Sequence, residues 1–162
     1  MKKNVVSIVM GSHSDWPTLE HGSQLLDQLD IPHEVHVLSA HRTPDALSEH
    51  IKSAESKGVE IFIAAAGGAA HLAGVVAAQT VLPVIGVPMQ TSSLNGMDSL
   101  LSMVQMPGGI PVATMAIGKA GAVNAALFAA SILAIAFPQY RQAIRDYRMT
   151  QEKKILEKSQ IK

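Results

Sequence analysis

The feature that most limits the possible folds is a regular alternation of short apolar segments and helical segments along the 162 residues. Residues 5–10, 61–65 and 84–87 are short apolar runs that contain β-branched side chains, as expected of buried strands. Apolar residues at helical spacing lie between these runs. The alternation predicts a parallel sheet with helices on both faces.

Two further strands complete the expected sheet, one at Val35, Val37 and Leu38 and one over residues 112–117. Helices are expected over residues 16–29, 44–57, 72–79, 98–105, 121–137 and 140–158. Five strands in this pattern favour a three-layer αβα sandwich with the flavodoxin-like order 2-1-3-4-5 and a C-terminal helix. In that order a ligand sits outside the carboxyl ends of strands 1 and 3. No repeat or linker is visible, so we expect a single domain over residues 1–162.

The expected helix over residues 121–137 has almost no polar face. A helix that is apolar on all sides must be buried on all sides, and this one is shorter than the ~20 residues of a membrane span. Charged residues are also scarce, at 16% of the chain. We therefore expect a homo-oligomer with this helix at or near its core, and with residues from about 139 to 162 packed on a neighbouring subunit.

Composition excludes several functions. The formal net charge is zero and no basic run occurs, so the charge pattern of nucleic-acid or membrane binding is missing. The chain has no cysteine, which excludes disulfides, thiolate nucleophiles and cysteine metal sites. The first residues run into a strand without a signal-peptide cleavage site, which indicates a cytoplasmic protein. Chemistry on a small molecule is the class that remains most favoured.

The segment Ser39-Ala40-His41-Arg42-Thr43-Pro44 joins a predicted strand to a predicted helix. A histidine exchanges protons near neutrality, and an arginine supplies a planar cation for phosphate or carboxylate. Thr43 and Pro44 are typical of a helix N-cap and first turn, where free backbone N–H groups also favour anions. The segment is either a catalytic and anion-binding turn or an ordinary connection with an exposed histidine.

Two other strand ends carry small and polar residues, at positions 11–15 and 67–72. Asp15 can cap the next helix or accept hydrogen bonds from ribose hydroxyls. Gly67 and Gly68 suit close ligand approach, although helix packing explains small residues as well. His71 either faces the ligand or is structural. Because all three turns follow parallel strands, we expect them to converge at one edge of the sheet.

Other nucleotide and metal motifs do not fit. Gly118-Lys119 is not a P-loop, because Ala113 and Ala120 occupy its first glycine and its Ser/Thr positions. His33 and His36 would point to opposite faces of a strand and make a poor metal pair. Three histidines lie at strand ends and are a nominal zinc set, namely His13, His41 and His71. No carboxylate partner for them is apparent. We expect no metal.

Five motifs together resemble one family. They are Gly-Ser-x-Ser-Asp-Trp at 11–16, Ser-Ala-His-Arg-Thr-Pro at 39–44, Gly-Gly-Ala-Ala-His-Leu at 67–72, Met-Pro-x-Gly-Ile-Pro-Val at 106–112 and Ala-Ile-Gly-Lys-Ala-Gly at 116–121. Over nearly the whole chain the sequence is similar to the class I PurE family of purine biosynthesis, the N5-carboxyaminoimidazole ribonucleotide mutases. Ala73 and Gly108 depart from the family pattern, which commonly has proline and arginine there.

The resemblance implies a reaction that moves a carboxylate from the exocyclic nitrogen to carbon 4 of an aminoimidazole ribonucleotide, without ATP, metal or organic cofactor. It implies decarboxylation followed by recarboxylation, with His41 as the proton shuttle, in a homo-octamer. Ser12, Asp15 and Arg42 match the family's nucleotide-binding positions. The full set of expected substrate contacts is Ser12, Ser14, Asp15, Ser39, Ala40, Arg42, Gly67, Gly68, Ala69, Ala70 and His71.

Two alternatives remain open. Class II relatives carboxylate aminoimidazole ribonucleotide directly with carbon dioxide. A flavodoxin-like module can also hold a phosphorylated ligand and perform no chemistry.

Overall fold

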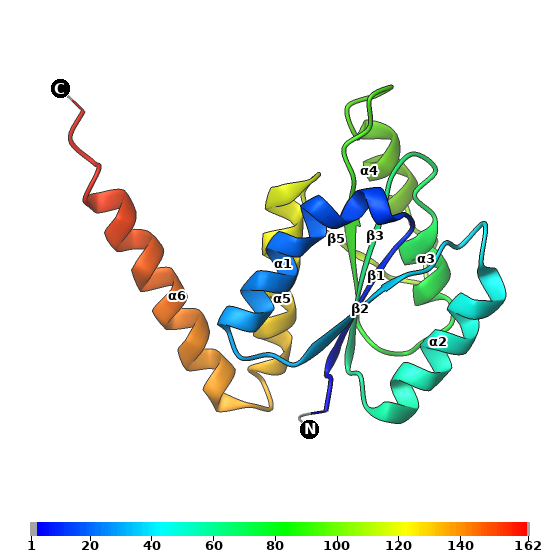
Figure 1. Ribbon diagram of the computed structural model, residues 1–162, viewed down its shortest axis with the longest axis horizontal. Coiled ribbons are helices and arrows are strands. Elements are labelled where there is room, and N and C mark those ends of the chain that lie inside the picture. The colour runs from blue at the N-terminus through cyan, green and yellow to red at the C-terminus, as the bar shows by residue number, and fades with distance from the viewer. Residues whose placement is uncertain (1–2, 162) are drawn as a thin grey trace.

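A five-stranded sheet forms the centre of the computed structural model, which describes residues 3–161. Its order is β2-β1-β3-β4-β5, and every neighbouring pair is parallel (Figure 1). The strands are β1 (Val6–Met10), β2 (His33–Val37), β3 (Ile61–Ala66), β4 (Val84–Pro88) and β5 (Ala113–Thr114). The flavodoxin-like order predicted from the sequence is confirmed.

Helices cover both faces of this sheet (Figure 1). They are η1 (His13–Asp15, a 3-10 turn), α1 (Trp16–Gln28), α2 (Pro44–Lys57), α3 (Leu72–Ala77), α4 (Met97–Val104), α5 (Lys119–Leu133) and α6 (Pro138–Leu156). Helices α1 and α5 pack on one face, whereas α2, α3 and part of α4 pack on the other. The three-layer sandwich is therefore present.

Each central strand supplies side chains to both layers. Ile8 and Ile63 belong to the core under α1 and α5, whereas Val9 and Phe62 belong to the core under α2 and α3. Successive side chains on a strand point to opposite faces, so a strand covered on both sides is apolar on both faces. This explains why β1 and β3 are apolar except for Ser7, whose buried hydroxyl lies 2.9 Å from His50 Nε2.

Strand β5 is much shorter than the expected 112–117. Only Ala113 and Thr114 pair regularly with β4. Beyond them, the backbone N–H groups of Met115 and Gly118 still donate to β4 carbonyls, each at 2.8 Å, but the chain turns and Gly118 has φ +73°. This segment therefore follows the sheet edge without strand geometry.

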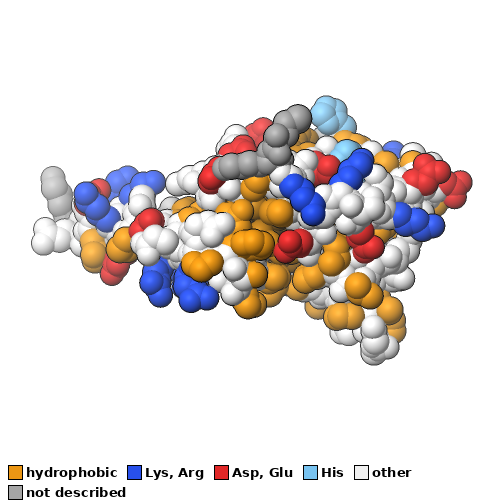
Figure 2. Space-filling view, turned by 90° about the horizontal axis from the view of Figure 1, so that it is seen from below, with side chains coloured by type: hydrophobic (Ala, Val, Ile, Leu, Met, Phe, Trp, Pro, Cys, Tyr) orange, Lys and Arg blue, Asp and Glu red, His pale blue; other side chains and the backbone are white. Residues whose placement is uncertain are grey.

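Helix α6 extends away from the sandwich (Figure 1), and Ile144 is its one buried residue. Ile155, near the end of this helix, is 68% exposed within the chain. Helix α5 buries one side against the sheet and α1, while Phe128 remains 41% exposed and Ile135, just beyond the helix, 80% exposed. Figure 2 shows hydrophobic side chains gathered between α6, on the left, and the rest of the molecule. Among the described residues, no helix is both long enough and apolar enough to cross a membrane.

Candidate active site

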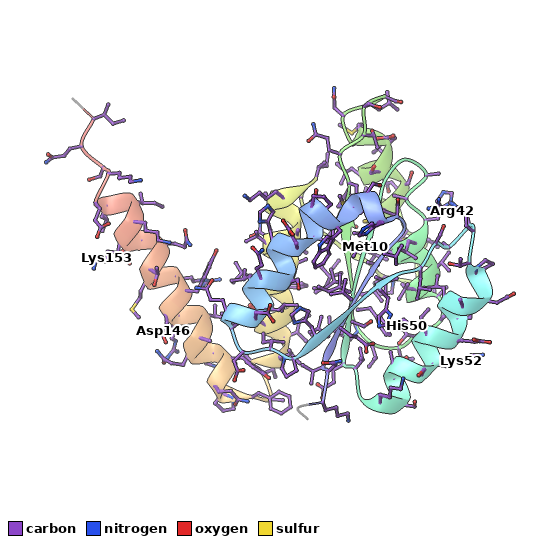
Figure 3. All side chains as sticks on the ribbon, viewed as in Figure 1. Met10, Arg42, His50, Lys52, Asp146 and Lys153 are labelled. Atoms are coloured by element: carbon purple, nitrogen blue, oxygen red, sulfur yellow. The ribbon has the colours of Figure 1, made fainter. Side chains whose placement is uncertain are left out.

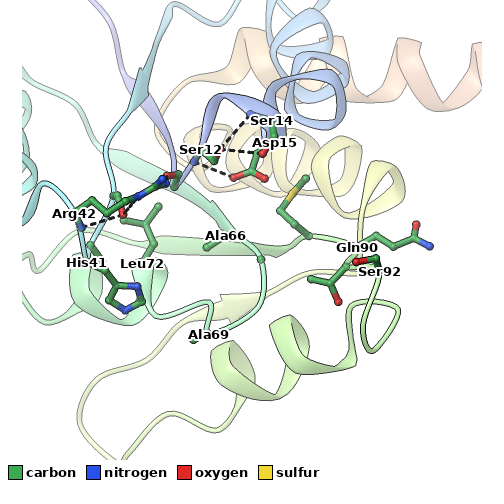
Figure 4. A pocket seen from close by; sticks show the side chains of 16 residues that line it. Ser12, Ser14, Asp15, His41, Arg42, Ala66, Ala69, Leu72, Gln90 and Ser92 are labelled. Atoms are coloured by element: carbon green, nitrogen blue, oxygen red, sulfur yellow. Dashed lines mark hydrogen bonds between the residues drawn. The ribbon is translucent and has the colours of Figure 1, made fainter.

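A cavity of about 510 Å³ opens at the carboxyl ends of β1, β3 and β4 (Figure 4). Strand β1 continues into α1 on one face of the sheet, whereas β3 continues into α3 on the other. The two connections diverge and leave a crevice between adjacent strands, which is the usual ligand site of such sheets. The position of the cavity agrees with the site expected from the strand order.

The first turn, after β1, is closed by its own side chains. The backbone N–H of Ser12 donates to Asp15 Oδ2 at 3.1 Å, and the Ser14 hydroxyl donates to Ser12 Oγ at 2.9 Å. Asp15 occupies the N-cap position of α1 but makes no capping hydrogen bond with that helix, so the capping role considered for it is wrong. Its carboxylate instead lies beside the cavity (Figure 4).

Burial raises the pKa of the Asp15 carboxyl above its ordinary value, although the Ser12 N–H and the Arg42 charge act in the opposite direction. Burial disfavours the charged form of an acid, and hydrogen bonds or cations restore it only in part. Asp15 is thus a partly desolvated carboxyl group at the cavity wall.

The second turn, after β2, brings Arg42 across to the first. Arg42 Nη2 donates to the Gly11 carbonyl at 2.7 Å, and its backbone N–H donates to Ser39 Oγ at 3.2 Å. Thr43 precedes α2, but its hydroxyl accepts from the Ser39 N–H at 2.9 Å and makes no capping bond. The expected Thr43 cap is therefore replaced by a side-chain bond that closes the turn itself.

Two histidines from different turns meet at the edge of the site. His41 Nε2 and His71 Nδ1 are 3.0 Å apart, and the rings stand edge to face at 87°. Both residues are exposed. His13 instead lines a separate hollow with Trp16 and Val37. The three strand-end histidines therefore do not lie together at one point.

The third turn, after β3, is held from below by α4. Gly68 has φ +68°, in the left-handed region that favours glycine. Its N–H donates to Ser99 Oγ at 3.0 Å, and its carbonyl accepts from Ser102 Oγ at 3.2 Å. Ser99 is completely buried. The backbone N–H and the carbonyl of Gly68 are thus both held by serines of α4, which the sequence analysis did not predict.

A fourth segment, residues 89–92 after β4, also lines the cavity and was missed. The Thr91 hydroxyl donates to Asp98 Oδ1 at 2.7 Å and accepts from the Gly96 N–H at 3.2 Å. Asp98 is in the first turn of α4, and Gly96 holds the N-cap position. The rule that parallel strands end at one edge applies to β4 as well and would have found this segment.

Most of the expected site residues surround the cavity, and three do not. Those at the cavity wall are Ser12, Ser14, Asp15, Ser39, Ala40, His41, Arg42, Gly67 and Ala69. Ala70 is fully buried behind the third turn, Gly68 lies outside the lining, and His71 reaches the site through His41. Ala73, which departs from the family pattern, is fully buried in α3.

Strand order and cavity together define a flavodoxin-like α/β protein with a polar site at the switch point of its sheet. The AIR carboxylase family profile matches residues 5–154. The chain belongs to the AIR carboxylase family.

Similar proteins carry consistent names. The chain is 59% identical over 153 residues to the N5-carboxyaminoimidazole ribonucleotide mutase of Pseudomonas aeruginosa, with 94% of each chain covered. It is 54% identical over 155 residues to the mutase of the same name in Bacillus subtilis, covering 96% of each. Among solved structures, Treponema denticola PurE superposes with a TM-score of 0.85 at 28% identity, covering 94% of each chain.

Proposed function

We propose that this protein is an N5-carboxyaminoimidazole ribonucleotide mutase of purine biosynthesis that acts in the cytoplasm. The observation that carries the proposal is the convergence of the turns after β1, β2 and β3 on one cavity, with His41, Arg42 and Asp15 at its wall. Relatives at 50–59% identity over most of the chain bear that name. Such a site offers a proton carrier, a cation for phosphate and an acceptor for hydroxyls.

His41 is the residue we assign to proton transfer. As imidazolium it donates a proton to the exocyclic nitrogen while the N–C bond to the carboxylate breaks, which leaves aminoimidazole ribonucleotide and carbon dioxide. Carbon 4 then attacks carbon dioxide, and neutral His41 removes the proton from that carbon. The histidine ends in the protonation state in which it began. The ring of His71, 3.0 Å away, positions the His41 imidazole from outside the cavity.

The ribonucleotide is held by the first two turns in this proposal. Arg42 and Ser14 bind the phosphate, since a planar guanidinium gives paired hydrogen bonds to phosphate oxygens. Asp15 accepts from the ribose hydroxyls. The third turn, including Gly67 and Ala69, lines the base and keeps water from the released carbon dioxide, because its side chains are small and carry no polar atoms.

A homo-oligomer, most simply an octamer, is part of the same proposal for this single-domain chain. Phe128 and Ile135 are exposed beside α6, and α6 itself has one buried residue, so a second copy that covers this region would remove apolar surface from water. The test is Phe128→Glu, with light scattering of the purified protein. We expect a lower mass than for the wild type, whereas an unchanged mass with the far-ultraviolet spectrum intact would contradict this interface. Ala129 is completely buried within one chain, so a charge there would test folding instead.

A turnover assay decides the activity. One sample receives the N5-carboxylated nucleotide, and a second receives aminoimidazole ribonucleotide with bicarbonate. We expect direct conversion of the first to the 4-carboxylated product. Conversion of the second alone would indicate direct carboxylation, and no turnover in either sample, with nucleotide bound, would indicate a binding module.

A further inference from the structure

A second group of chemically active side chains lies away from the cavity lining, between β2 and α2. Glu34 and His36 project from the same face of β2, and His50 projects from α2 toward them. Figure 3 shows the His50 side chain between α2 and the sheet. His33 points to the other face of β2, as its spacing from His36 predicted, and its Nε2 lies 2.7 Å from the Ser23 hydroxyl. The partner of His36 comes from a helix that follows later in the chain.

Three ligand atoms of this group converge. Glu34 Oε1 lies 3.6 Å from His36 Nε2 and 3.8 Å from His50 Nε2, and one donor atom of each residue lies within 4.8 Å of the others. Ligands of a tetrahedral zinc ion, bound at about 2.0–2.1 Å, are about 3.3 Å apart. The glutamate oxygen is therefore within a few tenths of an ångström of the required distance to each histidine nitrogen, and the two histidines, whose donor atoms lie within 4.8 Å of each other, need to close by at most about 1.5 Å to share one ion.

From this geometry we propose that Glu34, His36 and His50 form a binding site for one zinc-like divalent cation. Two histidines and one glutamate are an established zinc donor set with the fourth position open to water. His36 is 40% exposed, which gives the ion and a water molecule access, whereas His50 is 12% exposed and held rigidly. The Phe62 ring stands edge to face against His50, with centroids 6.5 Å apart, and fixes its orientation.

His50 must present a free ring nitrogen to bind an ion. Burial lowers the pKa of His50, His36 and Lys57 act in the same direction, and Glu34 opposes them. Only a neutral imidazole can coordinate a metal ion. The Ser7 hydroxyl, 2.9 Å from the same Nε2, competes for the nitrogen lone pair and must release it when an ion binds.

The ion would join β2 to α2, the two elements that flank the turn at residues 38–43. Zinc binding is therefore expected to raise the thermal stability of the protein, because an ion that binds only the folded chain stabilises it.

Zinc titration of untagged, chelator-treated full-length protein by calorimetry tests the proposal, with Co²⁺ as a spectroscopic probe. We expect one Zn²⁺ per chain, a higher melting temperature with zinc, and intense visible Co²⁺ bands typical of tetrahedral coordination. His36→Ala and Glu34→Gln should each weaken binding by about tenfold or more. Both residues are partly exposed, so these variants should fold, whereas a substitution of the more buried His50 would also disturb the packing of the core.

His71→Ala is the matched control, because it removes the other histidine pair in contact and should leave this binding unchanged. Ser7→Ala should bind zinc at least as well as wild type, since the competing hydrogen bond is gone. The proposal is overturned if zinc does not bind in a saturable way, if His36→Ala binds as wild type does, or if His71→Ala alone abolishes the Co²⁺ spectrum.

Discussion

Ser99→Ala tests how the third turn of the site is held. The hydroxyl of Ser99 accepts from the Gly68 N–H at 3.0 Å, and Ser99 is completely buried. A buried donor left without a partner costs about 1–3 kcal/mol, and the partial exposure of Gly68 places the cost in the lower half, at about 1–2 kcal/mol. For a chain of this length that corresponds to a fall in melting temperature of roughly 2–8 °C.

Activity should fall as well, because Gly67 lines the cavity and Gly68 follows it. A displacement of about 1 Å can cost about 100-fold in rate, so we expect kcat/KM for the carboxylated nucleotide to fall between about tenfold and 100-fold. Thermal unfolding and steady-state kinetics on the same preparation measure both effects.

Ser102→Ala is the matched control. Its hydroxyl lies 3.2 Å from the Gly68 carbonyl but only 2.7 Å from the carbonyl of Asp98 in its own helix, so we expect a loss of about 0.5 kcal/mol or less. A Ser99→Ala protein with wild-type stability and kinetics, or a larger loss in Ser102→Ala than in Ser99→Ala, would refute this account of the turn.

His41→Asn should reduce turnover by about 100-fold or more and leave nucleotide binding in place, because asparagine cannot carry a proton; more than a tenth of wild-type activity would disprove the assignment. Arg42→Lys should weaken ribonucleotide binding by about tenfold but leave nucleoside binding unchanged, as calorimetry can show. The ammonium group of lysine cannot make the paired hydrogen bonds that a guanidinium makes to a phosphate. Asp15→Asn should change the pH dependence of stability. Because folding raises the pKa of Asp15 above its ordinary value of 3.8, this group stabilises the wild type fully below pH 3.8. That stabilisation is lost as the pH rises through the pKa of Asp15 in the folded state. The stability of Asp15→Asn relative to the wild type should therefore rise as pH increases above 3.8 in urea titrations, and a constant difference would contradict the burial of that charge.

The sheet could be predicted because its central strands are buried on both faces. Residues 61–65 form a short run of apolar side chains, without the polar positions that a surface helix would have. Gly58 ends the preceding helix with φ +91°, which is typical of glycine after a helix. The fifth strand could not be delimited, because an edge strand pairs on one side only and nothing in residues 112–117 marks where pairing stops.

The site was predictable in its residues more than in its contacts. Histidine, arginine and aspartate at strand ends already indicated proton transfer and anion binding. That Arg42 reaches the Gly11 carbonyl, or that Ser99 lies under Gly68, depends on distances between segments 31 residues apart in each case. Such contacts are products of tertiary packing and leave no local pattern in the sequence.

Strand β2 differs from its neighbours in a way that affects motion. It pairs with β1 alone and all five of its residues are at least partly exposed, whereas β1 and β3 are buried throughout. Edge elements with few buried contacts open at lower free energy than the core, so the amide hydrogens of β2 should exchange with solvent well before those of β1 and β3. His41 and Arg42 follow this edge strand, whereas Ser12 and Gly67 follow strands that are buried on both faces, so we expect the second turn to be more mobile than the first and the third.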